Sequence, residues 1–509
     1  MANATERLML AAKEKELYDY QLKDLDTIFK KIDSTRPNAN IVYQLPTGGG
    51  KTVIFSEIVR RFITNRKQKV LVLTHRIELS VQTSKMLRGF GVKNKVINSK
   101  VKELPDQHEY MCFVAMVETL ANRLQDKKFT MKDIGLVIID EAHYNSFRKL
   151  FSYFNNALIL GVTATPLSSN IKLPMKDHYE ELLVGESISS LVKKGFLAKP
   201  EIYNYDVGLQ SLQVGANGDY TVKSSEEVYT ADGMQAKLIT AYEEKARGTK
   251  TLIFNNGINT SLFVYDTFRI AGYPVRHLDN TNTEKERKEI LTWFKETPDA
   301  VLTSVSILTT GFDEPSVETI ILNRATRSLT LYFQMIGRGS RVLPNKTTFQ
   351  IIDLGNNVAR FGAWDAPIDW QEIFNHPDYF LENITSDEEI ERHFIFEMSD
   401  ELRAKFANTK EIDFDIKAAY KKALSQGRPS KTALKLSIEQ HAKMCVENAK
   451  NASEARNLAF MLREDIAYRV KQYTYLIMNS TKNYRNWLEE DYMRKLRLKI
   501  VQSFSGVKN

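Results

Sequence analysis

A glycine-rich segment at residues 46–52 holds the residue types that bind phosphate. It follows an apolar run and opens an amphipathic stretch. Glycines let backbone N–H groups approach phosphate oxygens, and the first turn of a helix adds positive potential. Lys51 is expected to reach the β- and γ-phosphates of ATP, and the Thr52 hydroxyl to hold Mg²⁺. The predicted loop comprises Thr47, Gly48, Gly49, Gly50, Lys51 and Thr52, with Leu45 where the general pattern has its first glycine.

Two adjacent carboxylates, Asp140 and Glu141, directly follow the apolar run 136–139. If that run is a strand, both stand at the carboxyl end of a sheet, where α/β folds bind ligands. We expect Asp140 to hold Mg²⁺ and Glu141 to orient and deprotonate the attacking water, because phosphoryl transfer depends on positioning and charge. The alternative is an ordinary pair of charges at a helix start. The phosphate-binding segment earlier in the chain favours the catalytic interpretation.

A glutamine and two arginines form a third candidate group: Gln334, Arg338 and Arg341. The arginines are three residues apart, so on a helix they would share one face. Two guanidinium groups suit the charge that develops on a γ-phosphate during transfer. A solvated basic face is the alternative. We expect these residues to complete, from a second domain, an ATP site closed between two domains.

Alternation of strands and helices is the pattern that would position these groups. Buried strands are predicted at 41–43, 70–73, 136–139 and 158–162, and again at 251–254, 300–302, 319–322 and 349–352. A helix is predicted over 53–62, and helical stretches at 431–450 and 454–473 replace the strand pattern after about residue 370. We therefore predict an α/β fold of two tandem parallel-sheet domains, 1–198 and 199–365, followed by a mainly helical domain, 366–509.

Composition limits the class of protein. With 509 residues and 43% hydrophobic content, the chain has room for about three domains and is not disordered throughout. Its two cysteines, Cys112 and Cys445, fit a reducing compartment and exclude a multi-cysteine zinc site. Without a signal-peptide pattern or an apolar run of roughly 20 residues, we expect a cytoplasmic protein of a prokaryotic or phage-infected cell. The net charge of +8 permits a polyanionic partner and does not separate DNA from RNA.

Together the three segments resemble the superfamily 2 helicases and translocases, in particular their DEAH-type branch, over about residues 17–360. The resemblance implies RecA-like domains, hydrolysis of ATP with Mg²⁺, and a nucleic-acid partner. Tyr20 and Gln21 resemble the segment that reads adenine, although Tyr18 stands where the family has a basic residue. Other motif matches imply contacts to nucleic acid (Thr74, His75, Arg76, Thr119, Asn255 and Thr309), nucleotide contacts (Gly311 and Asp313) and coupling of hydrolysis to strand movement (His143, Thr163 and Thr165).

Segments at 74–76, 191–197 and 353–362 look closer to RadD-like and XPB-like DNA repair proteins and to phage branch-migration helicases than to DEAD-box RNA unwinders. This predicts a DNA-stimulated ATPase that unwinds or remodels forks, branches or duplex DNA, without a membrane partner, as a monomer or weak oligomer. The alternatives are an RNA helicase, the motor of a restriction or phage-defence complex, and a non-enzymatic scaffold with a decayed helicase fold. The intact Lys51, Asp140 and Glu141 argue against decay.

The C-terminal tail from residue 471 is basic and rich in aromatic residues. Such a composition fits nucleic-acid binding through phosphate contact and base stacking. A solvated helical face with an aromatic core stripe fits it slightly better, and both interpretations stay open. The aromatic residues are Tyr473, Tyr475, Tyr484, Trp487 and Tyr492.

Overall fold

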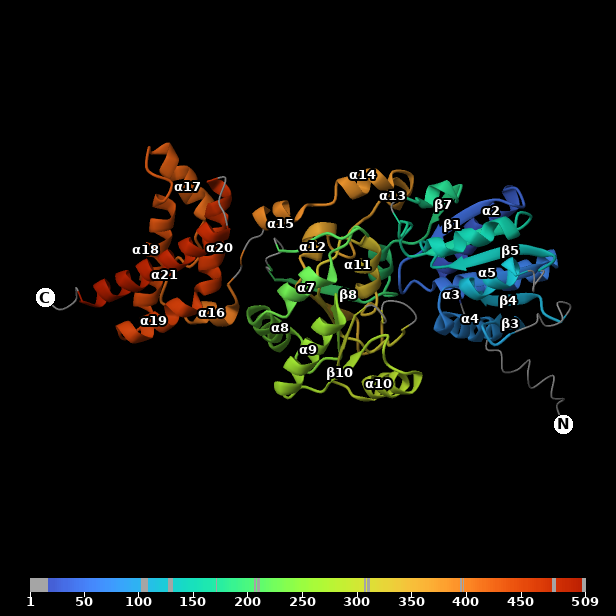
Figure 1. Ribbon diagram of the computed structural model, residues 1–509, viewed down its shortest axis with the longest axis horizontal. Coiled ribbons are helices and arrows are strands. Elements are labelled where there is room, and N and C mark those ends of the chain that lie inside the picture. Colours follow the sequence, from blue (N-terminus) through green and yellow to red (C-terminus); the bar gives the residue numbers. More distant parts are fainter. Residues whose placement is uncertain are drawn as a thin grey trace. The chain divides into compact units, whose positions relative to one another are not determined.

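A computed structural model of the chain describes residues 17–101, 109–126, 131–170, 172–205, 207, 211–305, 308, 312–393, 396, 398–477 and 482–505. The chain divides into two compact units, Met1–Asp387 and Glu388–Asn509. The first unit holds two parallel sheets, and the second is helical (Figure 1). No helix in these described ranges is both long and apolar enough to cross a membrane.

The first sheet has seven parallel strands. Every residue of its central strands β2, β5 and β6 is buried, as expected where helices cover both faces of a sheet. The strand order is β3 (Asn94–Ile97), β4 (Cys112–Met116), β2 (Lys69–Thr74), β5 (Ile134–Asp140), β6 (Leu158–Thr163), β1 (Asn40–Gln44) and β7 (Glu181–Val184). Its helices are α2 (Asp19–Ser34), α3 (Lys51–Arg66), α4 (Ile77–Gly89), α5 (Val117–Gln125), α6 (Ile188–Lys193) and the 3₁₀ helices η1 (Asn145–Tyr153) and η2 (Met175–Asp177).

The second sheet has six parallel strands, in the order β10 (Val275–Leu278), β11 (Val301–Ser304), β9 (Thr251–Asn255), β12 (Thr319–Asn323), β13 (Thr348–Asp353) and β8 (Lys199–Asn204). The associated helices are α7 (Val222–Tyr229), α8 (Asp232–Lys245), α9 (Ile258–Ile270), α10 (Glu284–Glu296), α11 (Leu329–Ile336) and α12 (Asn357–Phe361). All eight predicted strands are confirmed by the two sheets, and α3 confirms the helix expected over 53–62.

Two short helices after the second sheet return to the first. Helices α13 (Trp370–Asn375) and α14 (Pro377–Glu382) follow α12. Trp370, Ile373 and Phe374 are buried in the same hydrophobic core as both sheets, and Lys176 of η2 donates to the Asn375 carbonyl at 2.8 Å. These contacts place both helices with the sheets, in the first unit. The domain limits expected from the sequence stay predictions.

The second unit has its own hydrophobic core. In its longest helix, α21, Leu488, Tyr492, Leu496 and Ile500 are buried at intervals of four residues, which places them on one helical face. The helices are α15 (Asp387–His393), which begins at the boundary, α16 (Asp400–Ala404), α17 (Ile416–Ser425), α18 (Thr432–Glu447), α19 (Ala452–Met461), α20 (Arg463–Leu476) and α21 (Lys482–Ser505).

The helical stretch predicted over 454–473 is two helices rather than one. Between α19 and α20, Leu462 adopts φ −79° and ψ 4° and turns the chain. Its side chain is fully buried, so the apolar periodicity continues through the turn. Neither glycine nor proline marks this break in the sequence.

Candidate functional site

The phosphate-binding segment forms the turn between β1 and α3. Gly48 and Gly50 have φ of +94° and +85°, the left-handed region that favours glycine. A Cβ atom on Gly48 would lie 2.6 Å from Leu197 Cδ2 and 2.7 Å from Arg341 Nη1. Leu45 is buried, and its Cγ would lie 2.8 Å from a Cβ on Gly49. The loop thus needs glycine where it passes Arg341, and Leu45 packs against it from its own domain.

Helix α2 supports the same loop. The Tyr20 hydroxyl donates to the Gly49 carbonyl at 2.8 Å, and the Gln21 amide donates to that hydroxyl at 3.3 Å. The Gln21 side chain also accepts from the Tyr18 backbone N–H at 3.1 Å. Both predicted adenine-site residues are therefore at the phosphate loop, and Tyr18 is half exposed beside the Phe196 ring, with 4.5 Å between ring centroids.

Asp140 is the last residue of β5 and is buried, and Glu141 follows it with a side chain that is 13% exposed. Glu141 has φ of +56°, an unusual conformation for a residue with a side chain, and its Oε2 is buried without a hydrogen-bond partner. Burial and the Glu141 carboxylate raise the pKa of Asp140 to about 7, against the opposing effect of Lys51. Burial acts on Glu141 in the same direction, but Lys51 and the nearby histidines outweigh it and lower the pKa of Glu141. The site therefore holds one strained and partly unsatisfied carboxylate, that of Glu141, next to the buried Asp140.

A series of polar contacts connects Glu141 to α11 of the second sheet domain. His143 Nδ1 lies 3.5 Å from Glu141 Oε2 and 3.0 Å from the Thr163 hydroxyl. On its other side, His143 Nε2 is 3.5 Å from the Gln334 amide nitrogen. The Thr165 hydroxyl donates to the Thr330 hydroxyl at 3.0 Å. The three predicted coupling residues thus lie where the two sheet domains meet, and Thr330 is a partner that no sequence motif indicated.

The arginines do not share a helical face, which corrects our sequence-based interpretation. Helix α11 ends at Ile336, and Gly337 and Gly339 form the turn that follows. Close packing explains these glycines, because a Cβ on Gly337 would lie 2.6 Å from Thr47 and one on Gly339 would lie 2.4 Å from the Phe349 ring. Only glycine lets this turn approach the phosphate loop so closely.

The arginines nevertheless converge on one neighbouring segment. Arg338 donates to the Phe312 carbonyl at 2.5 Å, and Arg341 Nε donates to Asp313 at 3.0 Å. Burial is the main cause that lowers the pKa of Arg338 to about 10, with Arg341 adding to it. At a pKa of about 10 the Arg338 guanidinium is still positively charged at neutral pH.

Lys346 holds the turn that carries the arginines. Its ammonium donates to three carbonyl oxygens, those of Pro315 at 3.1 Å, Gly339 at 2.6 Å and Arg341 at 2.7 Å. The lysine is 5% exposed, and burial lowers its pKa to about 8. No motif in the sequence marked this residue.

A cavity of about 820 Å³ lies between α4 of the first sheet domain and α7, α9 and α10 of the second. The polar residues Arg76, Asn256, Asn259, Asn280 and Arg287 are among its lining side chains. Across it, Arg287 Nη1 forms an ion pair with Glu78 Oε1 at 2.7 Å. Amides and guanidinium groups that line an open cavity can bind the sugar-phosphate backbone of a nucleic acid.

Of the residues predicted to contact nucleic acid, one lines the cavity and others lie elsewhere in the first sheet domain. Arg76 lines the cavity, and His75 packs against the Tyr144 ring with neither ring nitrogen hydrogen-bonded. Thr74 is buried and shares a hydrogen bond with the Ser80 hydroxyl at 2.6 Å, while Thr119 is half-buried on α5. Thr309 and Gly311 lie outside the described residues.

Asn255 is buried in the sheet rather than at the cavity. Its amide donates to Thr303 at 2.8 Å and its carbonyl accepts from Asn323 at 2.7 Å, so the side chain is satisfied within the sheet. The neighbouring Asn256 lines the cavity instead. The strand β9 ends at Asn255, and Asn256 belongs to the bend that leads to α9.

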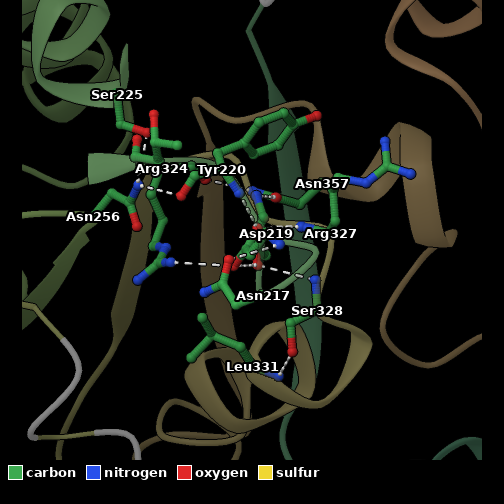
Figure 2. A network of polar contacts seen from close by, with 12 residues as sticks. Asn217, Asp219, Tyr220, Ser225, Asn256, Arg324, Arg327, Ser328, Leu331 and Asn357 are labelled. Atoms are coloured by element: carbon green, nitrogen blue, oxygen red, sulfur yellow. Dashed lines mark hydrogen bonds and ion pairs between the residues drawn. The ribbon is translucent and has the colours of Figure 1, made fainter. Parts of the chain in front are cut away.

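A polar network positions the cavity wall formed by α7 (Figure 2). Asp219 accepts from the Thr326 hydroxyl and from the Arg327 backbone N–H, each at 2.7 Å, and lies 3.6 Å from the buried Arg324. Asn256 donates to Ser225 of α7 at 2.6 Å (Figure 2). These contacts hold the segment before α7 against the end of β12, and sequence patterns did not indicate them.

A glycine-rich loop between β1 and α3 of one parallel-sheet domain lies against Arg341 of a second parallel-sheet domain, an arrangement that fits a two-domain ATPase. Residues 14–168 match the family described as "Type III restriction enzyme, res subunit", and residues 234–342 match the family described as "Helicase conserved C-terminal domain". The chain belongs to superfamily 2 of the helicases, a class of nucleic-acid-dependent ATPases. Its assignment to the DEAH-type branch stays a prediction.

Individual proteins are also similar in sequence to this chain. A 51.5 kDa protein of a Lactococcus phage is 27% identical over 65% of this chain and 69% of its own length. The Saccharomyces cerevisiae protein described as ATP-dependent helicase IRC3 is 27% identical over 66% of this chain, which spans about half of that relative (51%). The EcoAI endonuclease subunit, a type I restriction enzyme subunit of Escherichia coli, is 24% identical over 66% of the chain and 45% of its own length.

A solved structure shares the fold. It is a fragment described as an HsdR subunit of a type I restriction enzyme from Vibrio vulnificus, with a TM-score of 0.53 and 22% identity. The match covers 67% of this chain and 64% of that one. Both family matches end before the helical second unit begins.

Proposed function

We propose that the protein is an ATP-driven DNA translocase or helicase that unwinds or remodels forks, branches or duplex DNA. The observation that carries this proposal is the composite site, in which Gly48 of the phosphate loop packs against Arg341 of the second sheet domain. A site completed by both domains changes when they separate, so nucleotide turnover can alter how the two domains hold a strand.

The residues at this site suit ATP with Mg²⁺. Lys51 and the loop glycines would hold the phosphates, and Thr52 and Asp140 would hold the metal ion, which supplies charge stabilisation to the transferring phosphoryl group. The unpartnered Glu141 Oε2 is available to a water molecule, which this carboxylate would orient and deprotonate. Arg338 and Arg341 would stabilise the charge that develops on the γ-phosphate.

The contacts between the two sheet domains would couple ATP hydrolysis to movement of the strand. Hydrolysis alters the charge beside Glu141, and His143 lies between that carboxylate and Gln334 of the second domain. The Thr165–Thr330 hydrogen bond is a second link. We propose that these contacts pass the state of the ATP site to the cavity lined by Arg76 and Asn256, where the strand binds.

DNA is the proposed substrate because segments of the sequence resemble DNA repair and branch-migration proteins. Similarity to the EcoAI subunit supports the same choice, and relatives from a phage and from Escherichia coli support a role in the cytoplasm of a bacterial or phage-infected cell. The restriction-enzyme similarity also favours a second candidate, the motor of a restriction complex. Co-purification of a methyltransferase or nuclease with the chain would select that candidate.

The test is the steady-state Mg-ATPase rate without nucleic acid and with single-stranded DNA, duplex DNA, forked DNA and matched RNA. We expect stimulation by DNA, with the fork above the single strand. Stimulation by RNA alone would reject the DNA assignment, and no stimulation by any of them would reject an autonomous motor.

The matched control is Glu141→Gln, which removes the base and keeps the side-chain shape. We expect this variant to bind ATP normally and to lose turnover by about 100-fold or more, because general-base catalysis contributes 10²–10⁴-fold. Undiminished turnover would contradict the role of Glu141. Lys51→Ala should instead lose affinity for ATP.

A further inference from the structure

Positive charge is concentrated in the helical second unit. Residues 388–509 contain 23 Lys and Arg against 17 Asp and Glu, a net charge of +6 out of the +8 of the whole chain. The first unit contains 48 of the former and 46 of the latter and is nearly neutral. A basic unit attached to a neutral ATPase core attracts polyanions.

An aromatic pair lies at the surface of this basic unit. The rings of Tyr484 and Trp487, one helical turn apart on α21, are stacked with centroids 5.8 Å apart and an interplanar angle of 15°. The Lys431 ammonium lies 5.4 Å from the Trp487 centroid and 6.0 Å from the Tyr484 centroid. Two parallel rings and a cation therefore form one patch, contributed by α21 and the start of α18.

The structure separates the patch from the aromatic core. Tyr473 and Tyr492 are buried at 1% and 2% exposure, whereas Trp487 is 48% exposed and lies outside the hydrophobic core of the unit. Tyr484 packs partly against that core and so anchors the stack. The sequence left open whether these aromatic residues form a core stripe or a binding surface, and the folded unit contains both buried aromatic residues and an exposed indole.

Lys431 is available to a ligand. Within the described ranges, no carboxylate lies at ion-pairing distance from its ammonium, whereas Lys495 and Lys499 of the same unit are paired with Asp491 and Glu439. A half-exposed indole beside an unpaired lysine has the two features that single-stranded nucleic acids need, a surface for base stacking and a cation for phosphate. Bases within a duplex are already stacked and do not present their faces.

We propose that Trp487, Tyr484 and Lys431 form a second nucleic-acid site, which binds single-stranded nucleic acid by stacking of a base on Trp487 and by contact of Lys431 with a phosphate. The ligand class rests on the proposed function, but the site belongs to a separate unit. It would hold a strand whether or not the ATPase core is closed on nucleotide.

The test measures binding of the full-length protein to a fluorescein-labelled oligothymidylate without nucleotide, by anisotropy at several salt concentrations. Trp487→Ala should weaken binding about 5- to 160-fold, the range of a lost base–aromatic stack, and Trp487→Phe should weaken it less. Lys431→Gln should lower the salt slope by about 0.7, as expected for one lost phosphate contact to a single strand.

Trp487 also provides a direct signal. Oligothymidylate should quench the tryptophan fluorescence of the wild type, and Trp487→Phe should remove most of that quenching. The control is Phe460→Ala, because Phe460 is also exposed, at 55%, with the Arg463 guanidinium 5.2 Å from its ring, but no second ring among the described residues stacks on it. We expect this variant to bind as the wild type does.

The outcomes separate this inference from the proposed function. If DNA stimulates the ATPase but Trp487→Ala and Lys431→Gln bind as the wild type does, the patch is not a nucleic-acid site and the motor assignment stands. If Trp487 is quenched but no nucleic acid stimulates ATP hydrolysis, the patch is supported and the motor assignment fails. Binding of the wild type to anionic vesicles without quenching by the oligonucleotide would assign the patch to membranes and overturn the inference.

Discussion

The Glu141 Oε2 atom and the Lys346 side chain are both buried, but they differ in their hydrogen bonds. Glu141 is in a left-handed conformation with an unpartnered oxygen, whereas Lys346 donates three hydrogen bonds. Unsatisfied, strained groups cost stability and persist where function needs them. Saturated buried groups instead fix the positions of their neighbours, and Lys346 fixes the turn that holds Arg338 and Arg341.

Replacement of Lys346 by Met should therefore affect both stability and turnover. Three carbonyl oxygens would lose their donor, at a cost of about 1–3 kcal/mol in the free energy of unfolding. ATP turnover should fall further than ATP affinity, because Arg341 would lose its fixed position while Lys51 stays in place. Thermal unfolding and steady-state kinetics measure the two effects.

The control for this variant is Lys285→Met, which removes a lysine of the same sheet domain whose side chain is 87% exposed. This substitution should change neither stability nor turnover. Wild-type behaviour of the Lys346 variant would show that the turn holds its position without the lysine.

At the scale of elements, α4 and α10 meet across the cavity through one ion pair. Glu78 is 52% exposed and Arg287 is 27% exposed, so water screens the pair and limits its contribution to about 1 kcal/mol or less. The pair is therefore weak enough for a phosphate group to displace Glu78 from Arg287. In this structure the ion pair links the two helices.

Substitutions of the two partners should have opposite effects on DNA affinity. Glu78→Gln removes the competitor of the phosphate and should tighten binding up to about fivefold. Arg287→Ala removes the cation and should weaken binding while lowering its salt dependence. Anisotropy titrations with single-stranded DNA would test this, and a change in the same direction for both variants would contradict competition.

At the scale of the whole molecule, the second unit combines an apolar core with a buried polar network. His441 Nε2 lies 2.9 Å from Asp465, and the Tyr492 hydroxyl lies 2.9 Å from His441 Nδ1. Arg469 donates to Asp465 at 2.9 Å and to Ser437 at 3.0 Å. Burial and Arg469 lower the pKa of His441 to about 4, although Asp465 opposes them.

This network should make the second unit sensitive to acid. The unfolded chain protonates His441 near pH 6.5, whereas the folded unit does so only near pH 4. Between these values the unfolded state binds more protons, so stability falls as the pH falls, by up to about 3 kcal/mol. Calorimetry from pH 7 to pH 4 should show one of two unfolding transitions moving to lower temperature.

Two substitutions identify the group responsible. His441→Gln should flatten the pH dependence of that transition, at the cost of a lower melting temperature at pH 7. His393→Gln should leave it unchanged, because His393 is exposed in the same unit. An acid shift that survives in the His441 variant would assign the effect to carboxylates instead.

Local patterns determined much of this protein. The eight predicted strands, the glycine-rich turn that precedes α3 and the position of Asp140 at the end of a strand were predictable from sequence, because each depends on residues within about ten positions of one another. Burial on both faces of a parallel sheet leaves a continuous apolar run, and a loop that wraps phosphate needs adjacent glycines. Sequence alone shows such short-range requirements.

Only the tertiary structure decided which distant residues meet. It placed Thr330 against Thr165, Arg341 against Gly48, and Asn256 rather than Asn255 at the cavity. It also ended α11 before Arg338 and left Trp487 exposed while burying Tyr492. These outcomes depend on packing between segments far apart in the chain. Such contacts are not accompanied by a repeating pattern of residues in the sequence, so local sequence patterns do not predict them.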